Sequence, residues 1–294
     1  MFKRYLICTD LVDGLHRLTD FVPALVQGGC RQVVFTHVVP LWTEGDIPRI
    51  DDESVQAAQA RLDEALTHQR EGLEIIVDIQ SGNPEEAIPK LVQKYDCDVV
   101  LTGTATRSLM QETIFGSTSL RLARSMAVPL LLLRPQIMTT YTRAELALRC
   151  EHLWRYLLVP YSGSSESATY LLERLKAVLQ ADEGRSLQKC LLLTVINPGG
   201  RKRGITGDYQ AQTAEEQLAK AKAELGDCGV EIVTEVRSGD PMRQITEAAI
   251  KHDITAIATA QATRSALREF TAPSFANEIL RNSWFPVLFF SPKR

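Results

Sequence analysis

Short apolar runs alternate with amphipathic stretches along the whole chain, and this alternation predicts a regular succession of strands and helices. In the first half, the strand-like runs occupy residues 5–9, 32–39, 74–80, 99–102 and 129–134. Between them, apolar residues recur with helical spacing at residues 15–27, 51–70, 84–95 and 119–126. Uniformly apolar strands separated by helices favour a parallel sheet that is covered by helices on both faces.

The second half of the chain repeats this order of elements and some of the sequence itself. Strands are predicted at residues 156–161, 189–196, 230–236, 255–259 and 287–291, and helices at 164–180, 209–225, 241–252 and 275–281. The sequence Ala-Thr-Arg-Ser at residues 105–108 recurs at residues 262–265, and Gly82-Asn83-Pro84 corresponds to Gly239-Asp240-Pro241. The chain therefore contains two copies of one domain in tandem.

The spacing between the copies predicts the domain limits. The offset is 151 residues between Tyr5 and Tyr156 and 157 residues between Gly82 and Gly239, which indicates one net insertion early in the second half. We place the extra residues in the glycine-rich loop at 197–208. The predicted organisation is a first domain at residues 1–135, a linker with some helical character at 136–152, and a second domain at 153–294. Right-handed crossovers make each domain a doubly wound sheet, whose ligands bind beyond the carboxyl ends of the strands.

Composition and charge narrow the classes of partner. Hydrophobic residues make up 45% of the chain, charged residues 23%, and the formal net charge is -3, so there is no overall attraction to nucleic acid or to an anionic membrane. The one basic run, Arg201-Lys202-Arg203, is interpreted as a solvated loop. The longest apolar runs are strand-sized and no signal peptide is recognised, which predicts a cytoplasmic protein. The six cysteines form no C-x-x-C pair and the histidines no H-x-x-x-H pair, so neither a disulfide framework nor a metal site is expected.

A candidate phosphate-binding loop follows the fourth strand of the first half. Gly103 opens this loop, and Gly116-Ser117-Thr118 closes it just before a helix, with the spacing Gly103-x2-Thr106-x9-Gly116-Ser117. Glycine lets the backbone approach a phosphate closely, while the helix N-terminus and the hydroxyls supply hydrogen-bond donors. Asp10 ends the first strand and is expected at the same edge of the sheet, where it can accept from the amino group of a base or hold a metal.

These motifs resemble the universal stress protein family, whose nucleotide-binding members carry G-x2-G-x9-G-[ST] and an Asp after the first strand. The resemblance covers essentially the whole chain twice. It implies an α/β fold with two tandem flavodoxin-like (adenine nucleotide alpha hydrolase-like) domains, each a five-stranded parallel sheet with helices on both faces. It also implies binding of ATP, ADP or AMP in the first domain, with Mg²⁺ if a triphosphate is bound. The implied nucleotide-binding residues are Asp10 and Val38 (through its backbone) at the adenine, Gly103 and Thr106 at the ribose and phosphates, and Gly116, Ser117 and Thr118 at the phosphates.

The chain departs from the family pattern once in the first domain and repeatedly in the second. Thr106 replaces the second glycine of the motif, and a β-branched residue there weakens binding or shifts it towards fewer phosphates. In the second half, Ser162 stands for Asp10, Ala260 for Gly103, Thr263 for Thr106, and Pro273-Ser274 for Gly116-Ser117. Proline lacks an N–H donor, so the second domain is expected to be a degenerate copy.

The sequence is compatible with three hypotheses about function. The leading hypothesis is a stress-response regulatory protein that binds an adenine nucleotide in its first domain, with at most weak ATP hydrolysis and no catalytic residues assigned. The alternative is an interaction module that acts through its surfaces without nucleotide. A third hypothesis is an adenylating enzyme that uses the turn at residues 162–167, which differs in two letters from the S-G-G-x-D-S loop. A homodimer and a protein partner of unknown identity are compatible with each hypothesis.

Overall fold

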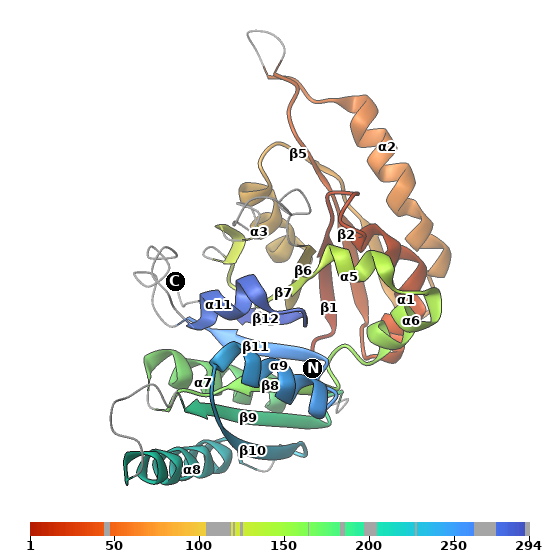
Figure 1. Ribbon diagram of the computed structural model, residues 1–294. Coiled ribbons are helices and arrows are strands. Elements are labelled where there is room, and N and C mark those ends of the chain that lie inside the picture. Colours follow the sequence, from red (N-terminus) through yellow and green to blue (C-terminus); the bar gives the residue numbers. More distant parts are fainter. Residues whose placement is uncertain are drawn as a thin grey trace. The chain divides into compact units, whose positions relative to one another are not determined.

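The computed structural model describes residues 1–43, 48–103, 119, 121–123, 126–163, 165–182, 186–196, 205–226, 228–261 and 275–291 (Figure 1). They form two compact units, Phe2–Glu151 and His152–Arg294. Each unit contains five parallel strands and a buried apolar core.

The first unit is built on a parallel sheet whose strand order reverses in the middle. The strands are β1 (Arg4–Cys8), β2 (Gln32–Thr36), β4 (Glu74–Val77), β6 (Val99–Gly103) and β7 (Leu130–Leu133), in the spatial order β4-β2-β1-β6-β7. The chain steps outward from β1 to β4 and then crosses back to β6 on the other side of β1. This reversal leaves a crevice between β1 and β6 at the carboxyl edge, which is where doubly wound sheets bind ligands. The predicted fold class is confirmed.

The helices of the first unit follow the predicted positions but are divided into shorter segments. The expected helix at 15–27 consists of η1 (Leu15–Phe21) and α1 (Val22–Gln27), and the one at 51–70 consists of α2 (Asp52–Leu62) and η2 (Asp63–His68). α3 (Pro84–Lys94) begins after Asn83, whose side chain accepts a hydrogen bond from Glu85 N at 3.0 Å. Asp51 caps α2 in the same way, because its side chain accepts from Ser54 N at 3.0 Å.

The segment after β7 carries two helices that pack on the first unit. These are α5 (Pro135–Thr140) and α6 (Arg143–Glu151), and α6 lies against α1. Arg17 of η1 donates to Met138 O at 2.5 Å and to Tyr141 O at 3.0 Å, which fixes the end of α5. The close approach of α6 explains Gly28, since a Cβ there would lie 2.6 Å from Glu151 O.

Two predicted strands of the first unit are interrupted at the carboxyl edge. The run at 32–39 forms β2 and then β3 (Val38–Val39), and the run at 74–80 forms β4 and then β5 (Gln80–Ser81). The pairing register is the same on both sides of the interruption, since Phe35 pairs with Val77 and Val38 with Gln80. At the break, Thr36 Oγ1 donates to Asp78 O at 2.7 Å.

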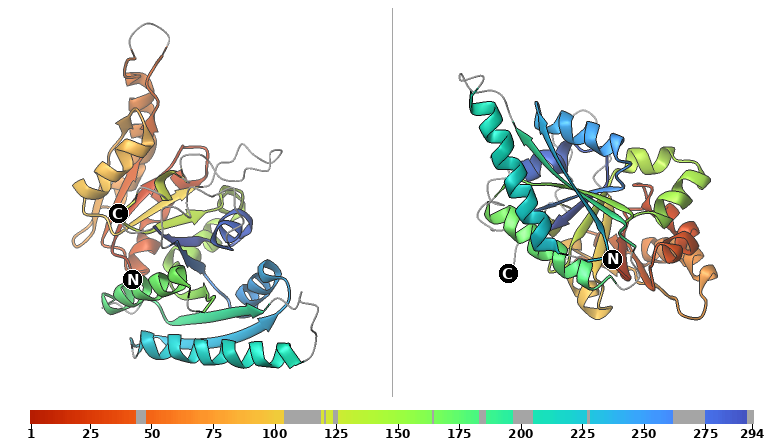
Figure 2. Two further views of the ribbon diagram at one scale, coloured as in Figure 1. Left: turned by 90° about the vertical axis from the view of Figure 1, so that its left-hand side faces the viewer. Right: turned by 90° about the horizontal axis from the view of Figure 1, so that it is seen from below.

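The second unit repeats this topology with uninterrupted strands. Its strands are β8 (Tyr156–Pro160), β9 (Lys189–Ile196), β10 (Glu231–Ser238), β11 (Ala256–Ala260) and β12 (Val287–Phe290), in the order β10-β9-β8-β11-β12. Its helices are α7 (Glu166–Gln180), α8 (Ile205–Leu225), α9 (Pro241–Lys251) and α11 (Phe275–Asn282). α8 runs lengthwise along β9 and β10 (Figure 2). It begins four residues before the predicted start at Tyr209. Gly207, which the sequence placed in a loop, lies inside the helix.

Strand pairing corrects the alignment of the two first strands. Tyr5 pairs with Val99. The counterpart of Val99 at an offset of 157 is Ala256 (256 minus 99), and Ala256 pairs with Leu157. Leu157 therefore corresponds to Tyr5, and the offset at the first strand is 152 (157 minus 5) and not 151.

The position of the insertion is also different from the prediction. Tyr5 pairs with Val33, and Leu157 pairs with Cys190, so the offset has already reached 157 at the second strand (190 minus 33). The next spacing is unchanged, because Gln32 pairs with Glu74 and Lys189 with Glu231, 42 residues apart in both cases. The five extra residues lie between β8 and β9, around α7, and the expectation that the loop at 197–208 holds them is wrong.

Each unit has a cluster of polar side chains at its third strand, and comparison of the two halves of the sequence did not reveal these clusters. In the first unit, the Asp78 carboxylate accepts from Lys94 Nζ at 2.8 Å, from Tyr95 Oη at 2.6 Å and from Gln80. Burial alone would raise the pKa of Asp78, but these hydrogen bonds outweigh it and lower the pKa.

The second unit has the same cluster at an offset of 157 residues. Glu235 accepts from His252 Nε2 at 2.7 Å, from Arg237 Nε at 2.9 Å and from Lys251 Nζ at 3.2 Å. Burial again opposes ionisation, yet the three donors lower the pKa of Glu235 to about 2. Each cluster ties the end of the helix after the third strand to the strand itself. We refer to the two clusters as the carboxylate clamps.

Candidate functional site

A cavity of about 190 Å³ opens at the carboxyl edge of the first sheet, at the crevice between β1 and β6. It brings together Asp10, Val38 and Gly103, three of the predicted nucleotide-binding residues. Thr106, Gly116, Ser117 and Thr118 lie outside the described residues. The remaining lining residues come from five elements and the turns that follow them: Cys8, Thr9, Asp13, Thr36, His37, Pro84, Ile88, Thr102, Ser119 and Leu122.

The backbone of Val38 is oriented towards the end of β1. The carbonyl oxygens of its neighbours His37 and Val39 accept from Gln80 N and Gly82 N, both at 2.9 Å, so they face β5. Because peptide groups alternate in direction along a strand, the N–H and C=O of Val38 point away from β5. On that side β1 has already ended, with a last bond from Thr9 N to Thr36 O at 3.1 Å. Val38 therefore presents one donor and one acceptor to a space that no strand of the described residues fills.

Asp10 is exposed at the turn that follows β1. Its Oδ1 accepts from Val12 N at 2.9 Å, which holds the side chain over the turn. Leu11 has a φ of +65°, a backbone conformation that side chains rarely adopt and that makes this turn tight. A carboxylate can accept up to about four hydrogen bonds, so Asp10 retains acceptor capacity for a ligand.

Asp13 is a buried residue of the site that the sequence did not identify. Its Oδ1 accepts from Thr9 Oγ1 at 2.6 Å and from Leu15 N at 2.9 Å. Burial raises the pKa of the Asp13 carboxyl, and the hydrogen bonds from Thr9 and Leu15 oppose the rise only in part. A Cβ on Gly103 would lie 2.9 Å from Asp13 Oδ2 and 3.1 Å from Asp13 Cβ. Gly103 is thus required by the position of Asp13 as well as by any ligand.

Two further hydrogen bonds fix the rim of the cavity. His37 Nδ1 lies 2.8 Å from Thr9 O, and since a carbonyl can only accept, Nδ1 carries the proton. This hydrogen bond ties His37 to the end of β1. Ser119 Oγ donates to Gly103 O at 3.0 Å and links the end of β6 to the next helix.

In the second unit, the serine-rich turn after β8 begins a helix. Ser165 accepts from Ala168 N at 3.2 Å and caps α7, while its Oγ lies 3.0 Å from Ser162 Oγ. These contacts give Ser165 a capping role. Ser164 lies outside the described part of the chain.

Within the described ranges, no group of three or more His, Cys, Asp or Glu residues could hold a metal ion. No helix among the same residues has the length and apolar character needed to cross a bilayer.

Comparison with known proteins identifies the family. The sequence profile of the universal stress protein family matches residues 1–134 and again residues 154–291. The chain therefore belongs to the universal stress protein family, with two of its domains in tandem. No curated protein matches the sequence.

Two solved structures show the same fold over nearly the whole length. A universal stress protein from Archaeoglobus fulgidus DSM 4304 is 17% identical, covers 98% of both chains and superposes with a TM-score of 0.62. A candidate universal stress protein from Pseudomonas aeruginosa UCBPP-PA14 is 15% identical, covers 99% of this chain and 94% of that chain, and has a TM-score of 0.60. A universal stress protein in complex with cAMP is 17% identical, covers 48% of this chain and 98% of that chain, and has a TM-score of 0.36.

Proposed function

We propose that the first domain binds an adenine nucleotide in the cavity between β1 and β6, and that the protein acts as a nucleotide-dependent regulator in a stress response. The observation that carries the proposal is the convergence of Asp10, Val38 and Gly103 on one cavity at the switch point of the sheet. These residues come from the ends of three different strands, so only the fold brings them together.

Each of the three residues supplies a group that suits a part of the nucleotide. The N–H and C=O of Val38 match the acceptor and donor on the edge of adenine, and Asp10 accepts from the amino group or from ribose hydroxyls. Gly103 lets a ribose approach the end of β6 without meeting a side chain. The predicted phosphate contacts, from Gly116, Ser117 and Thr118, rest on the sequence motif alone.

Mg²⁺ is proposed only as a companion of a triphosphate. Magnesium bound to nucleotide phosphates keeps several waters and needs only one or two carboxylates from the protein. Asp10 is the exposed carboxylate of this cavity that can serve. We assign no hydrolytic step, and the homodimer and the cytoplasmic location stay predictions.

Calorimetric titration with ATP, ADP and AMP tests the proposal, after mass spectrometry of any nucleotide that copurifies. We expect about one equivalent per chain, and Asp10→Ala should weaken binding about 10- to 100-fold through loss of a charged acceptor. Ser162→Ala is the matched control, because Ser162 holds the same position in the second domain. Gly116→Pro should abolish binding, while Ser274→Ala should leave it intact.

The outcomes separate the nucleotide hypothesis from its alternative. Absence of both copurified nucleotide and binding heat would overturn the proposal and favour an interaction module that acts without nucleotide. Equal losses from Asp10→Ala and Ser162→Ala would contradict the assignment to the first domain.

A further inference from the structure

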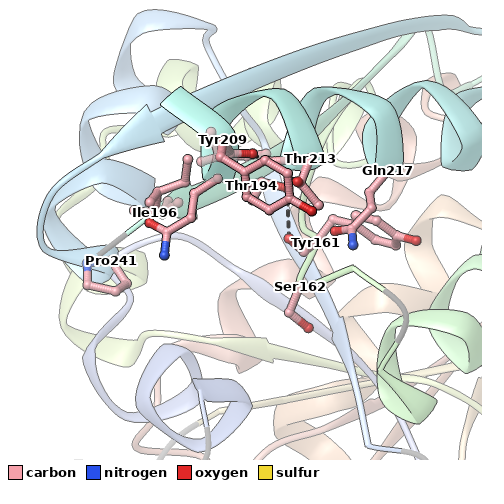
Figure 3. A pocket seen from close by; sticks show the side chains of 12 residues that line it. Tyr161, Ser162, Thr194, Ile196, Tyr209, Thr213, Gln217 and Pro241 are labelled. Carbon is pink, nitrogen blue, oxygen red and sulfur yellow. Dashed lines mark hydrogen bonds between the residues drawn. The ribbon is translucent and has the colours of Figure 1, made fainter. Parts of the chain in front are cut away.

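The second unit contains a larger cavity, which the sequence did not predict. Its volume is about 480 Å³, compared with about 190 Å³ for the cavity in the first unit. It lies at the carboxyl ends of β8 and β9 and under the first turns of α8 (Figure 3). Volumes of about 300–1,000 Å³ are typical of sites for small molecules. We call it the α8 cavity, after the helix that supplies Tyr209, Thr213 and Gln217 to its wall.

The helix over this cavity is longer than its counterpart in the first unit. α8 begins at Ile205, four residues before Tyr209, which is the counterpart of the first residue of α2, Asp52, at the offset of 157. Tyr209 and Thr213 of α8 lie over the carboxyl edge of the sheet (Figure 3). In the first unit, α2 contributes no residue to the lining of the smaller cavity.

The wall of the α8 cavity carries no charge among the residues that the structure describes. Twelve residues line it, and none is acidic or basic. The larger part of the wall is apolar, from Leu193, Val195, Ile196, Ala214 and Pro241. Ser162 occupies the position of Asp10, so the acceptor proposed for adenine is missing. A phosphate here would lose its hydration without gaining an opposite charge from the described wall, which is costly.

Two hydroxyls of the wall are arranged to accept hydrogen bonds. Thr194 Oγ1 donates to Tyr161 O at 2.9 Å, and Thr213 Oγ1 donates to Tyr209 O at 2.8 Å. Because each hydroxyl has a single hydrogen, both oxygens can offer only lone pairs to a ligand. These two oxygens therefore suit a ligand that carries a hydrogen-bond donor.

Two aromatic rings define the shape of the site. Tyr161 lies half-buried beside Gln217, and Tyr209 projects from α8 with 73% of its surface exposed (Figure 3). Gln217 is held against the backbone of Gly163, where a Cβ would collide with its amide. Burial raises the pKa of Tyr161, and the negative charge of Glu224 raises it further, so Tyr161 stays neutral at pH 7. Aromatic side chains stack favourably on flat rings.

We propose that the α8 cavity binds an uncharged, flat aromatic small molecule that carries at least one hydrogen-bond donor, and that it does not bind a nucleotide. The site is separate from the nucleotide site proposed in the first domain, so either assignment can fail without the other.

The test compares two probes that differ only in charge, 2-naphthol and 2-naphthyl phosphate. We expect 2-naphthol to bind the full-length protein saturably in equilibrium dialysis, with about one equivalent per chain, and 2-naphthyl phosphate to bind at least tenfold more weakly. Thr213→Trp should fill the cavity and weaken 2-naphthol binding at least tenfold. Gln212→Trp places the same ring on the exposed neighbouring position of α8 and should leave binding unchanged.

Three outcomes would overturn the proposal. These are the absence of saturable 2-naphthol binding to the wild type, equal binding to both tryptophan variants, and equal or tighter binding of 2-naphthyl phosphate. The last outcome would show that the site takes an anion. Circular dichroism confirms folding of Thr213→Trp, and its nucleotide binding should match the wild type because the first domain is untouched. If Thr213→Trp does not fold, Ser162→Trp takes its place, because a bulky ring at this exposed position of the lining should also fill the cavity and weaken 2-naphthol binding.

Discussion

Gly103 ends β6 beside a carboxylate that leaves it no room for a side chain. Because Asp13 is held by Thr9 and Leu15, a Cβ on Gly103 would displace Asp13 or the strand end. We expect Gly103→Ala to lower the free energy of unfolding by about 1–3 kcal/mol, as overpacking does elsewhere, and to weaken nucleotide binding. Urea unfolding followed by circular dichroism measures the first effect.

The second domain supplies the control for this prediction. Its residues at the corresponding positions are Ala260 and Ser165, so an alanine is accommodated where the aspartate is a serine. In an Asp13→Ser background, the cost of Gly103→Ala should therefore be smaller, and a double-mutant cycle measures the difference. An equal cost in both backgrounds would show that Asp13 is not the obstacle.

At the same scale, the sequence predicted some residues of the site and missed others. Asp10 and Gly103 could be placed together because each lies at the carboxyl end of a strand, and parallel strands end at one edge, whereas Val38 was implied by the family resemblance. Asp13 was not identified as a residue of the site because its contact with Gly103 spans 90 residues and leaves no local pattern. Tyr161 and Thr213 escaped notice for the same reason, since only the packing of α8 on the sheet brings them to one cavity.

At the scale of elements, the carboxylate clamps hold the helix after the third strand in both domains. The folded-state pKa of Glu235 is about 2, below its ordinary value of 4.5. Its contribution to stability is therefore fully present above pH 4.5 and is lost as the pH falls towards 2. Glu235→Gln should lower the free energy of unfolding at pH 7 by about 1 kcal/mol, a value kept small because the cluster is partly solvated.

The pH dependence distinguishes the clamp from general acid sensitivity. The stability difference between Glu235→Gln and the wild type should shrink between pH 4.5 and pH 2.5 in urea titrations. Glu231→Gln, at an exposed position of the same strand, should show little difference at any pH. A constant difference for Glu235→Gln over this range would contradict the assignment.

The order and type of elements could be read from the sequence, and their limits could not. Hydrophobic periodicity located the strands because they are buried on both faces, as Leu6, Val34 and Leu131 are. It missed the interruption at His37, which depends on the contact of Thr36 with a distant strand. It also misplaced the start of α8, because glycine normally marks a loop and Gly207 lies in a helix.

On the scale of the whole molecule, two unlike sites predict two independent responses to ligand. A ligand that binds only the native state slows global opening of its own domain, about 100-fold at a concentration of about 100 times Kd. ADP should therefore slow amide hydrogen exchange in β1 and β6, and 2-naphthol should slow it in β8 and β9. Mass spectrometry of exchanged peptides measures both effects. Protection of all four strands by either ligand would contradict independent sites.

The equal spacing of 42 residues from the second to the third strand has a consequence for how such proteins diversify. The first domain uses this interval for an exposed turn, in which Trp42 bridges to Arg49, and for the shorter helix α2, whereas the second domain uses it for α8. One length of chain thus borders either a smaller cavity or a larger one on the same scaffold. A duplicated domain can change its cavity in this way with no shift of strand register. Because the two intervals are equal in length, protein engineers could exchange them between the domains.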